Sequence, residues 1–187
     1  MKHHLPNILT WIRIGFIPVF VVFFYLPWDW ARLTVAGIFA LAGFTDWLDG
    51  YLARSLSVTS DLGAFLDPVA DKLLVVSALI LLVSEANFPF LSIAAVIIAG
   101  REIIISALRE WMAEVGKRAS VAVSYLGKVK TVLQFLAILL LLLGRPDDLN
   151  THPLIGLLGY VCLIVAAFMT IWSMVIYLMA ARQVLKK

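Results

Sequence analysis

The sequence predicts an all-α polytopic membrane protein with six transmembrane helices and both termini in the cytoplasm. Of its 187 residues, 63% are hydrophobic and only 14% are charged, against about 45–50% and about 25% in soluble domains. The apolar residues gather in six runs, and a helix needs about 20 residues to cross a hydrocarbon core of about 30 Å. The bilayer is therefore the expected solvent, and residues 1–187 are expected to form one membrane domain.

The six runs are separated by turn residues. A short amphipathic segment is expected to precede the first run, which closes at Pro27-Trp28-Asp29-Trp30. Later breaks fall at 54–61, at Glu85–Pro89 and at Gly144–Asp148. The predicted helices cover residues 8–26, 31–53, 63–84, 88–108, 124–143 and 153–180.

Basic residues set the expected orientation. If six helices are threaded through the membrane, Arg32 and Arg145 fall on one side. Most other basic residues fall on the opposite side, which is therefore the cytoplasmic one. The excess of basic residues behind the net charge of +3 is explained by their role in setting this orientation. No nucleic-acid partner is therefore expected.

Carboxylates stand where a membrane helix should carry none. Asp46 and Asp49 lie in the second run, and Asp67 and Asp71 lie in the third. Each costs roughly 2.5–3.5 kcal/mol near a helix centre if it is left unpaired. Helical geometry places each pair on one face of its helix. Such a cluster of hard oxygen ligands suits Mg²⁺ or Mn²⁺.

Small residues and a cation accompany these acids. Gly50 and Ala53 leave an empty strip beside Asp46, and Arg54 is placed to meet a phosphate. The pattern favours a metal–phosphate site. An internal salt-bridge network, or a proton or cation pathway in a transporter, is the alternative interpretation.

The spacing Asp46-Thr-Trp-Asp49-Gly50-Tyr-Leu-Ala53-Arg54, followed after eight residues by Gly63-Ala-Phe-Leu-Asp67-Pro-Val-Ala-Asp71, resembles the signature of the CDP-alcohol phosphatidyltransferases. The resemblance implies a membrane enzyme that moves a phosphatidyl group from a CDP-activated lipid to an alcohol and releases CMP. It implies a homodimer as well. By the same resemblance, the four aspartates hold two divalent metals, Asp71 is the general base, and the CDP-diacylglycerol site includes Gly50, Ala53, Arg54 and Gly63.

A second group of charges bears on the acceptor alcohol. Arg101 and Arg109 interrupt the fourth run, and Lys128 and Lys130 begin the fifth. Cations beside a phosphate-transfer site predict an acceptor that carries its own phosphate. Lys128 and Lys130 lie about 200° apart on an ideal helix, so one of them can face lipid headgroups. Glu102 lies seven residues before Arg109 and is expected to support it.

The acceptor region and the opening stretch Leu5–Arg13 resemble bacterial phosphatidylglycerophosphate synthases, a branch of the same family. This resemblance implies sn-glycerol 3-phosphate as acceptor and a place in the bacterial inner membrane, with the site on the cytoplasmic side. Arg13, inside an apolar run, is expected to bind the CDP-diacylglycerol. Asn7 and Thr10 are assigned to the same substrate, although they could equally be helix caps. Inositol phosphate or a phospholipid remains an alternative acceptor.

Overall fold

The chain folds into six α-helices in a computed structural model, with no strand among the described residues. The structure describes residues 5–28, 30–56, 61–85, 89–116, 125–144 and 152–185. Within these ranges, the side chains left outside the description are those of residues 5–10, 47, 49–56, 61–65, 67–68, 125–126, 128, 180 and 183–185. The helices are α1 Leu5–Phe24, α2 Ala31–Leu56, α3 Asp61–Glu85, α4 Leu91–Glu114, α5 Tyr125–Leu143 and α6 Pro153–Leu185.

The six predicted helices are confirmed, with ends that differ by a few residues. The largest differences are at the ends of α4 and α6, which continue to Glu114 and Leu185 through charged residues. The expected amphipathic opening segment is continuous with α1 from Leu5 onward. Residues 1–4 lie outside the described residues.

Apolar side chains cover much of the outer surface. Val96, Val132 and Phe168 are each about 70% exposed, although all three lie inside helices. Helix α4 and residues Pro153–Met179 of α6 are long and apolar enough to cross a membrane, and shorter apolar helices run over Trp11–Phe24 and Val129–Leu143. The architecture is that of a polytopic membrane protein.

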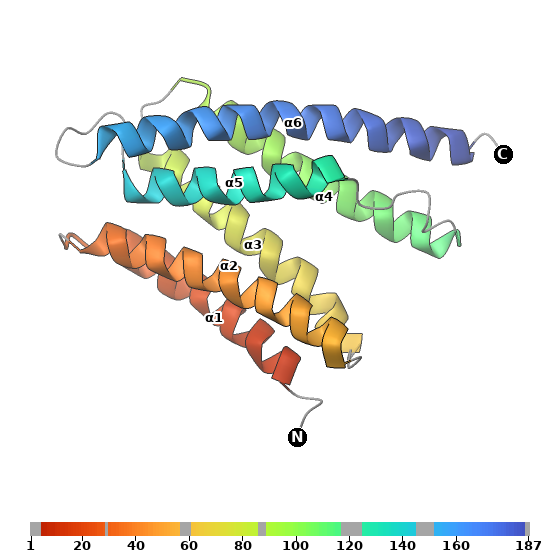
Figure 1. Cartoon of the computed structure of the whole chain (residues 1–187), viewed down its shortest axis with the longest axis horizontal. Coiled ribbons are helices and arrows are strands. Elements are labelled where there is room, and N and C mark those ends of the chain that lie inside the picture. Colours follow the sequence, from red (N-terminus) through yellow and green to blue (C-terminus); the bar gives the residue numbers. More distant parts are fainter. Residues whose placement is uncertain are drawn as a thin grey trace.

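Successive helices run in alternating directions, so the first residues of α1 and the last of α6 point toward the same end of the molecule (Figure 1). Helix α1 packs on α2 and α3, and α6 packs on α4 and α5. Contacts of α5 with α2 and α3 join these two groups. At the opposite end, Arg32 Nη2 lies 3.9 Å from Glu85 Oε2.

An aromatic contact fixes α5 against α2. The Phe39 and Phe135 rings stack with centroids 4.6 Å apart. Gly43 permits this contact, because a Cβ atom at Gly43 would lie 2.3 Å from the Phe135 ring. Helix α5 is therefore held where one of its faces lines the polar cavity described below.

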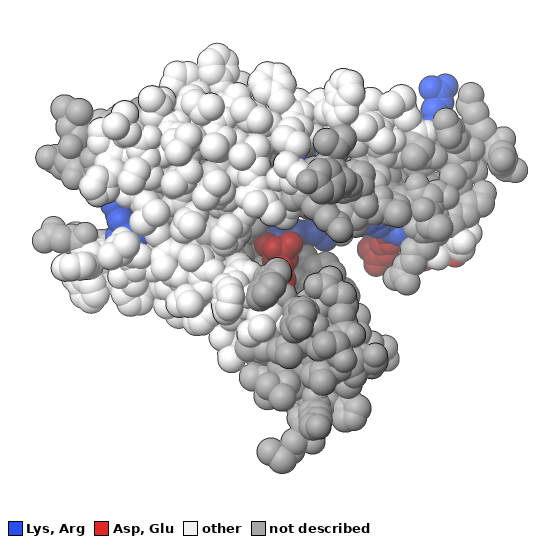
Figure 2. Space-filling view, viewed as in Figure 1, with Lys and Arg blue, Asp and Glu red and all other residues white. Residues whose placement is uncertain are grey.

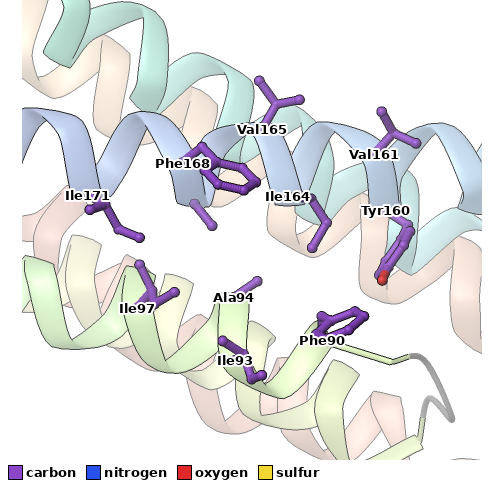
Figure 3. A pocket seen from close by; sticks show the side chains of 11 residues that line it. Phe90, Ile93, Ala94, Ile97, Tyr160, Val161, Ile164, Val165, Phe168 and Ile171 are labelled. Carbon is purple, nitrogen blue, oxygen red and sulfur yellow. The ribbon is translucent and has the colours of Figure 1, made fainter.

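Helices α4 and α6 leave an apolar groove on the outside of the bundle (Figure 3). Its volume is about 510 Å³. Phe90, Ile93 and Ile97 line it from α4 and the turn before it, and Ile164 and Phe168 line it from α6. Apolar side chains line the groove on both of its sides.

Candidate active site

A polar cavity of about 330 Å³ lies among α3, α4, α5 and α6. Figure 2 shows acidic and basic side chains close together in a hollow near the middle of this face. The cavity is lined by Asp71, Lys72, Val75, Arg101, Glu102, Arg109, Gly127, Thr131, Gln134, Phe135 and Tyr177.

Helix α3 supplies a carboxylate and an ammonium group. Asp71 and Lys72 are neighbours in sequence, and both line the cavity. The Lys72 Nζ donates a hydrogen bond to the Ser106 Oγ on α4. This bond links α3 to α4 beside the carboxylate of Asp71.

Helix α4 supplies two guanidinium groups, and α6 supplies the aromatic ring that both contact. The Cζ atoms of Arg101 and Arg109 lie 5.7 Å and 5.5 Å from the centroid of the Tyr177 ring. Arg109 Nη2 also lies 3.5 Å from the Tyr177 Oη, to which it donates. Tyr177 is only 5% exposed. The two arginines, eight residues apart on α4, are thus brought to one cavity by cation–π contacts with one ring.

Glu102 neutralises part of this positive charge. Its Oε1 lies 2.9 Å from Arg101 Nη1 and 2.6 Å from Lys130 Nζ. The expected support of Arg109 by Glu102 is not among the ion pairs of the described residues, because Glu102 is turned toward Arg101 and α5 instead. Lys130 is 1% exposed, and it reaches the site through Glu102. The Lys128 side chain lies outside the described residues.

Helices α1 and α2 meet in a second charged contact. Arg13 Nη1 lies 2.8 Å from Asp46 Oδ1. The Arg13 side chain is 1% exposed, whereas that of Asp46 is 46% exposed. Asp46 and Arg13 both lie within electrostatic range of Asp71. The Arg13–Asp46 pair joins α1 to α2, and neither residue is among those that line the cavity.

Several residues expected in the site cannot be placed by their side chains. Helix α2 carries Asp49, Gly50, Ala53 and Arg54 in its last turns, and α3 carries Gly63 and Asp67 in its first two turns. Because α2 runs into α3 at the site end, these residues share that end with Asp46 and Asp71 (Figure 1). The side chains of all six, and those of Asn7 and Thr10, lie outside the described residues.

The donor atoms that are described fit a divalent metal. Asp46 and Asp71 offer carboxylate oxygens from two neighbouring helices, and such oxygens suit Mg²⁺ or Mn²⁺. Among the described residues no group of three or more His, Cys, Asp or Glu residues is gathered at one point. A complete ligand set therefore requires acids beyond these two, and Asp49 and Asp67 are the acids nearest in sequence.

The structure adds four residues with polar side chains that the sequence motifs did not assign to the site. Lys72, Thr131, Gln134 and Tyr177 all line the cavity. A signal existed for Lys72 and Gln134, because each interrupts an apolar helix with a polar group. Tyr177 gave no such signal, because a tyrosine in an apolar run is ordinarily a packing residue or a residue at the membrane–water interface.

The chain is similar to known proteins over nearly its whole length. Residues 3–181 match the family model described as CDP-alcohol phosphatidyltransferase. A protein of Sodalis glossinidius (strain morsitans) is 53% identical over 182 residues, with 97% of each chain covered. A protein of Escherichia coli (strain K12) is 48% identical over 182 residues, again with 97% of each covered. A protein of Pseudomonas fluorescens is 47% identical over 179 residues, covering 95% of this chain and 90% of the relative. All three bear the name CDP-diacylglycerol–glycerol-3-phosphate 3-phosphatidyltransferase.

This similarity, together with the six helices and the acids of α2 and α3, establishes that the chain belongs to the CDP-alcohol phosphatidyltransferase family.

Proposed function

We propose that the chain transfers the phosphatidyl group of CDP-diacylglycerol to sn-glycerol 3-phosphate, which yields phosphatidylglycerophosphate and CMP. The names of relatives about half identical to it support this activity. The observation that carries the proposal is the cavity that Lys72, Arg101 and Arg109 line together with Asp71. A cationic cavity beside a carboxylate suits an acceptor that bears both a phosphate and a hydroxyl group.

The two arginines have donor groups to offer to that phosphate. The Nε atoms of Arg101 and Arg109 are buried and have no hydrogen-bond partner among the described residues. A buried guanidinium N–H without a partner costs free energy that a phosphate oxygen would recover through a charge-assisted bond. We assign the acceptor's phosphate to Arg101 and Arg109. Lys130 and Lys128 are assigned to the same part of the site.

Asp71 is assigned the role of general base. It accepts the proton of the attacking hydroxyl while that oxygen bonds to the lipid-side phosphorus of the diphosphate. The bond from that phosphorus to the bridging oxygen breaks, and CMP leaves with the electron pair. The phosphate and the hydroxyl of one small acceptor are held by α4 and α3, so the hydroxyl is positioned for attack before the reaction begins.

Members of this family generally depend on a divalent metal. Asp46, Asp49, Asp67 and Asp71 are the residues we expect to hold it, and two Mg²⁺ or Mn²⁺ ions are our proposal. A metal held by these residues would supply stabilisation of the negative charge that grows on the phosphoryl oxygens.

The CDP-diacylglycerol is assigned to the α1–α2 side of the cavity. The residues proposed for it are Asn7, Thr10, Arg13, Gly50, Ala53, Arg54 and Gly63. The Arg13–Asp46 pair supports this placement, because it brings a buried cation to an acid of α2. We place the site at the cytoplasmic face of a bacterial inner membrane, where a water-soluble acceptor can reach it.

The activity is tested by measuring CMP release from CDP-diacylglycerol by the purified protein in detergent. The acceptors compared are glycerol 3-phosphate, inositol phosphate and phosphatidylglycerol, each with and without EDTA. We expect release with glycerol 3-phosphate alone, and its loss in EDTA. Release with another acceptor instead would contradict the choice of acceptor. Ion flux through proteoliposomes without any CMP release would support a transporter.

A further inference from the structure

Gln134 is a buried polar residue in the cavity wall whose carbonyl group is unused. The side chain is 5% exposed and belongs to α5. Its Oε1 has no hydrogen-bond partner among the described residues. Of the neighbouring polar groups, Thr131 Oγ1 donates its hydrogen to the Gly127 carbonyl at 2.9 Å, and Tyr177 Oη accepts from Arg109.

The chemistry of this atom defines what it can bind. An amide carbonyl oxygen only accepts hydrogen bonds, so it repels phosphate oxygens and complements a hydroxyl group. Buried acceptors are nearly always paired in folded proteins. A buried carbonyl without a partner, on a residue that lines a ligand-sized cavity, therefore points to a hydroxyl of the ligand.

We propose that Gln134 accepts a hydrogen bond from the secondary hydroxyl at carbon 2 of the acceptor. This inference rests on the proposed function. The other two substituents are already assigned, since the phosphate lies against Arg101 and Arg109 on α4 and the attacking hydroxyl against Asp71 on α3. Only the carbon-2 hydroxyl remains, and Gln134 offers it a buried carbonyl oxygen, without a partner among the described residues, from a third helix.

Three contacts from three helices define the handedness of the acceptor. If the phosphate and the attacking hydroxyl of sn-glycerol 1-phosphate occupied the same two subsites, its carbon-2 hydroxyl would point away from Gln134. Gln134 is then a specificity-determining residue. It favours sn-glycerol 3-phosphate over its enantiomer.

The test combines a change in the protein with a change in the acceptor. Gln134→Met keeps the length of the side chain and removes the carbonyl oxygen. The second acceptor, 3-hydroxypropyl phosphate, keeps the phosphate and the attacking hydroxyl and lacks the carbon-2 hydroxyl. Leu136→Met is the matched control, since Leu136 lies on the same helix and is 43% exposed. CMP release gives kcat and KM for each protein with each acceptor.

We expect the unmodified protein to prefer glycerol 3-phosphate to 3-hydroxypropyl phosphate by about 2- to 12-fold in kcat/KM, the range of one neutral hydrogen bond. Gln134→Met should lose the same factor with glycerol 3-phosphate and nothing with 3-hydroxypropyl phosphate. The preference of the Gln134→Met variant for sn-glycerol 3-phosphate over sn-glycerol 1-phosphate should also be smaller than that of the unmodified protein. The KM for CDP-diacylglycerol should stay constant, and Leu136→Met should change none of these values.

Equal losses with both acceptors would overturn the proposal, because Gln134 would then act by packing or by orienting Arg101. An unchanged preference in Gln134→Met would overturn it as well. If Gln134→Met fails to fold, Gln134→Asn takes its place, since the shorter amide withdraws the carbonyl and predicts the same pattern. Failure of the proposed function gives a different result, because the unmodified protein would then release no CMP with glycerol 3-phosphate.

Discussion

Asp71 combines two properties that a general base requires. Its carboxylate is exposed and lines the cavity, and cationic groups that suit a phosphate line the same cavity. A carboxylate in this position can take a proton from a hydroxyl that the cations hold nearby. The residue is therefore the first point at which to test the mechanism.

Replacing Asp71 with Asn should lower kcat by at least about 10²-fold, because the amide can neither accept the proton nor hold a metal in the same way. The protein should still fold and insert. The measurement is CMP release at saturating substrates, with Glu114→Gln at the exposed end of α4 as the control. Near-normal turnover would remove Asp71 from the role of base.

Arg109→Gln should weaken the binding of glycerol 3-phosphate by about 10- to 150-fold, the value of a charge-assisted contact of about 1.5–3 kcal/mol. Arg101→Gln should do the same, with an added loss of stability because Arg101 also pairs with Glu102. The KM for CDP-diacylglycerol should change little in either variant, whereas Arg54→Gln should show the reverse pattern. Saturation curves for both substrates are the measurement, and exposed Arg182→Gln is the control. Equal weakening of both substrates would place the arginines in the fold or in the lipid-substrate site.

Individual residues were predictable where they violated the rules for a membrane helix. Asp46 and Asp71 are costly in an apolar run, so their presence alone indicated a site. Tyr177 was not found, because its role depends on neighbours from another helix, whereas Gln134 gave a polar signal that was not used. The same limit applies to Glu102. Helical spacing predicted that it supports Arg109, whereas in the structure its carboxylate pairs with Lys130 of the neighbouring helix α5.

At the scale of the element, the helices were predictable because each apolar run is about as long as a membrane crossing. The breaks at Pro27 and at Gly144-Arg145-Pro146 mark helix ends in the sequence and in the structure. The ends of α4 and α6 were placed too early, since both helices continue beyond the apolar run into charged residues. Hydropathy identifies the apolar part of a helix that spans the membrane, but it does not identify the charged turns by which the same helix continues beyond the membrane.

The packing of α5 on α6 depends on a close approach at Gly159. A Cβ atom there would lie 2.9 Å from the Leu140 Cβ and 2.9 Å from the Leu141 backbone nitrogen. Small residues permit such approaches between membrane helices. This contact helps to hold the α6 residues, Tyr177 among them, against the rest of the bundle.

Gly159→Ala should therefore lower the stability of the folded protein by about 1–3 kcal/mol, the usual range for overpacking. Gly37→Ala is the matched control, because a Cβ atom at Gly37 meets nothing within 4 Å. That change should be neutral or stabilise α2 by up to about 1 kcal/mol. Thermal unfolding in detergent measures both. An equal effect of the two substitutions would contradict the assignment of a packing role to Gly159.

At the scale of the whole molecule, the alternation of helix directions brings the acids of α2 and α3 to the same end as the arginines of α4 (Figure 1). The even number of helices was predictable from the sequence. The side of the membrane on which this end lies stays a prediction from the basic residues. A single domain over residues 1–187 and a homodimer also stay predictions.

Single cysteines labelled in a background without Cys162 should test the orientation. Positions 2, 118 and 186 are expected to react from the cytoplasmic side, and positions 29 and 147 from the opposite side. The reagent is a membrane-impermeant maleimide applied to intact cells and to inverted vesicles. A reversed pattern would invert the orientation, and a mixed one would contradict six crossings.

The length of α6 has a consequence for how the molecule sits in a membrane. Its apolar stretch Pro153–Met179 has 27 residues, which at 1.5 Å per residue is about 40 Å. That exceeds a hydrocarbon thickness of about 30 Å, so the mismatch must be relieved by tilt of α6 or by local thickening of the lipid. Tyr177, near the end of this stretch, contacts Arg101 and Arg109. A change of tilt would shift the ring against both arginines. In vesicles of increasing acyl-chain length, the KM for glycerol 3-phosphate should therefore vary with bilayer thickness, and Tyr177→Leu should reduce that variation.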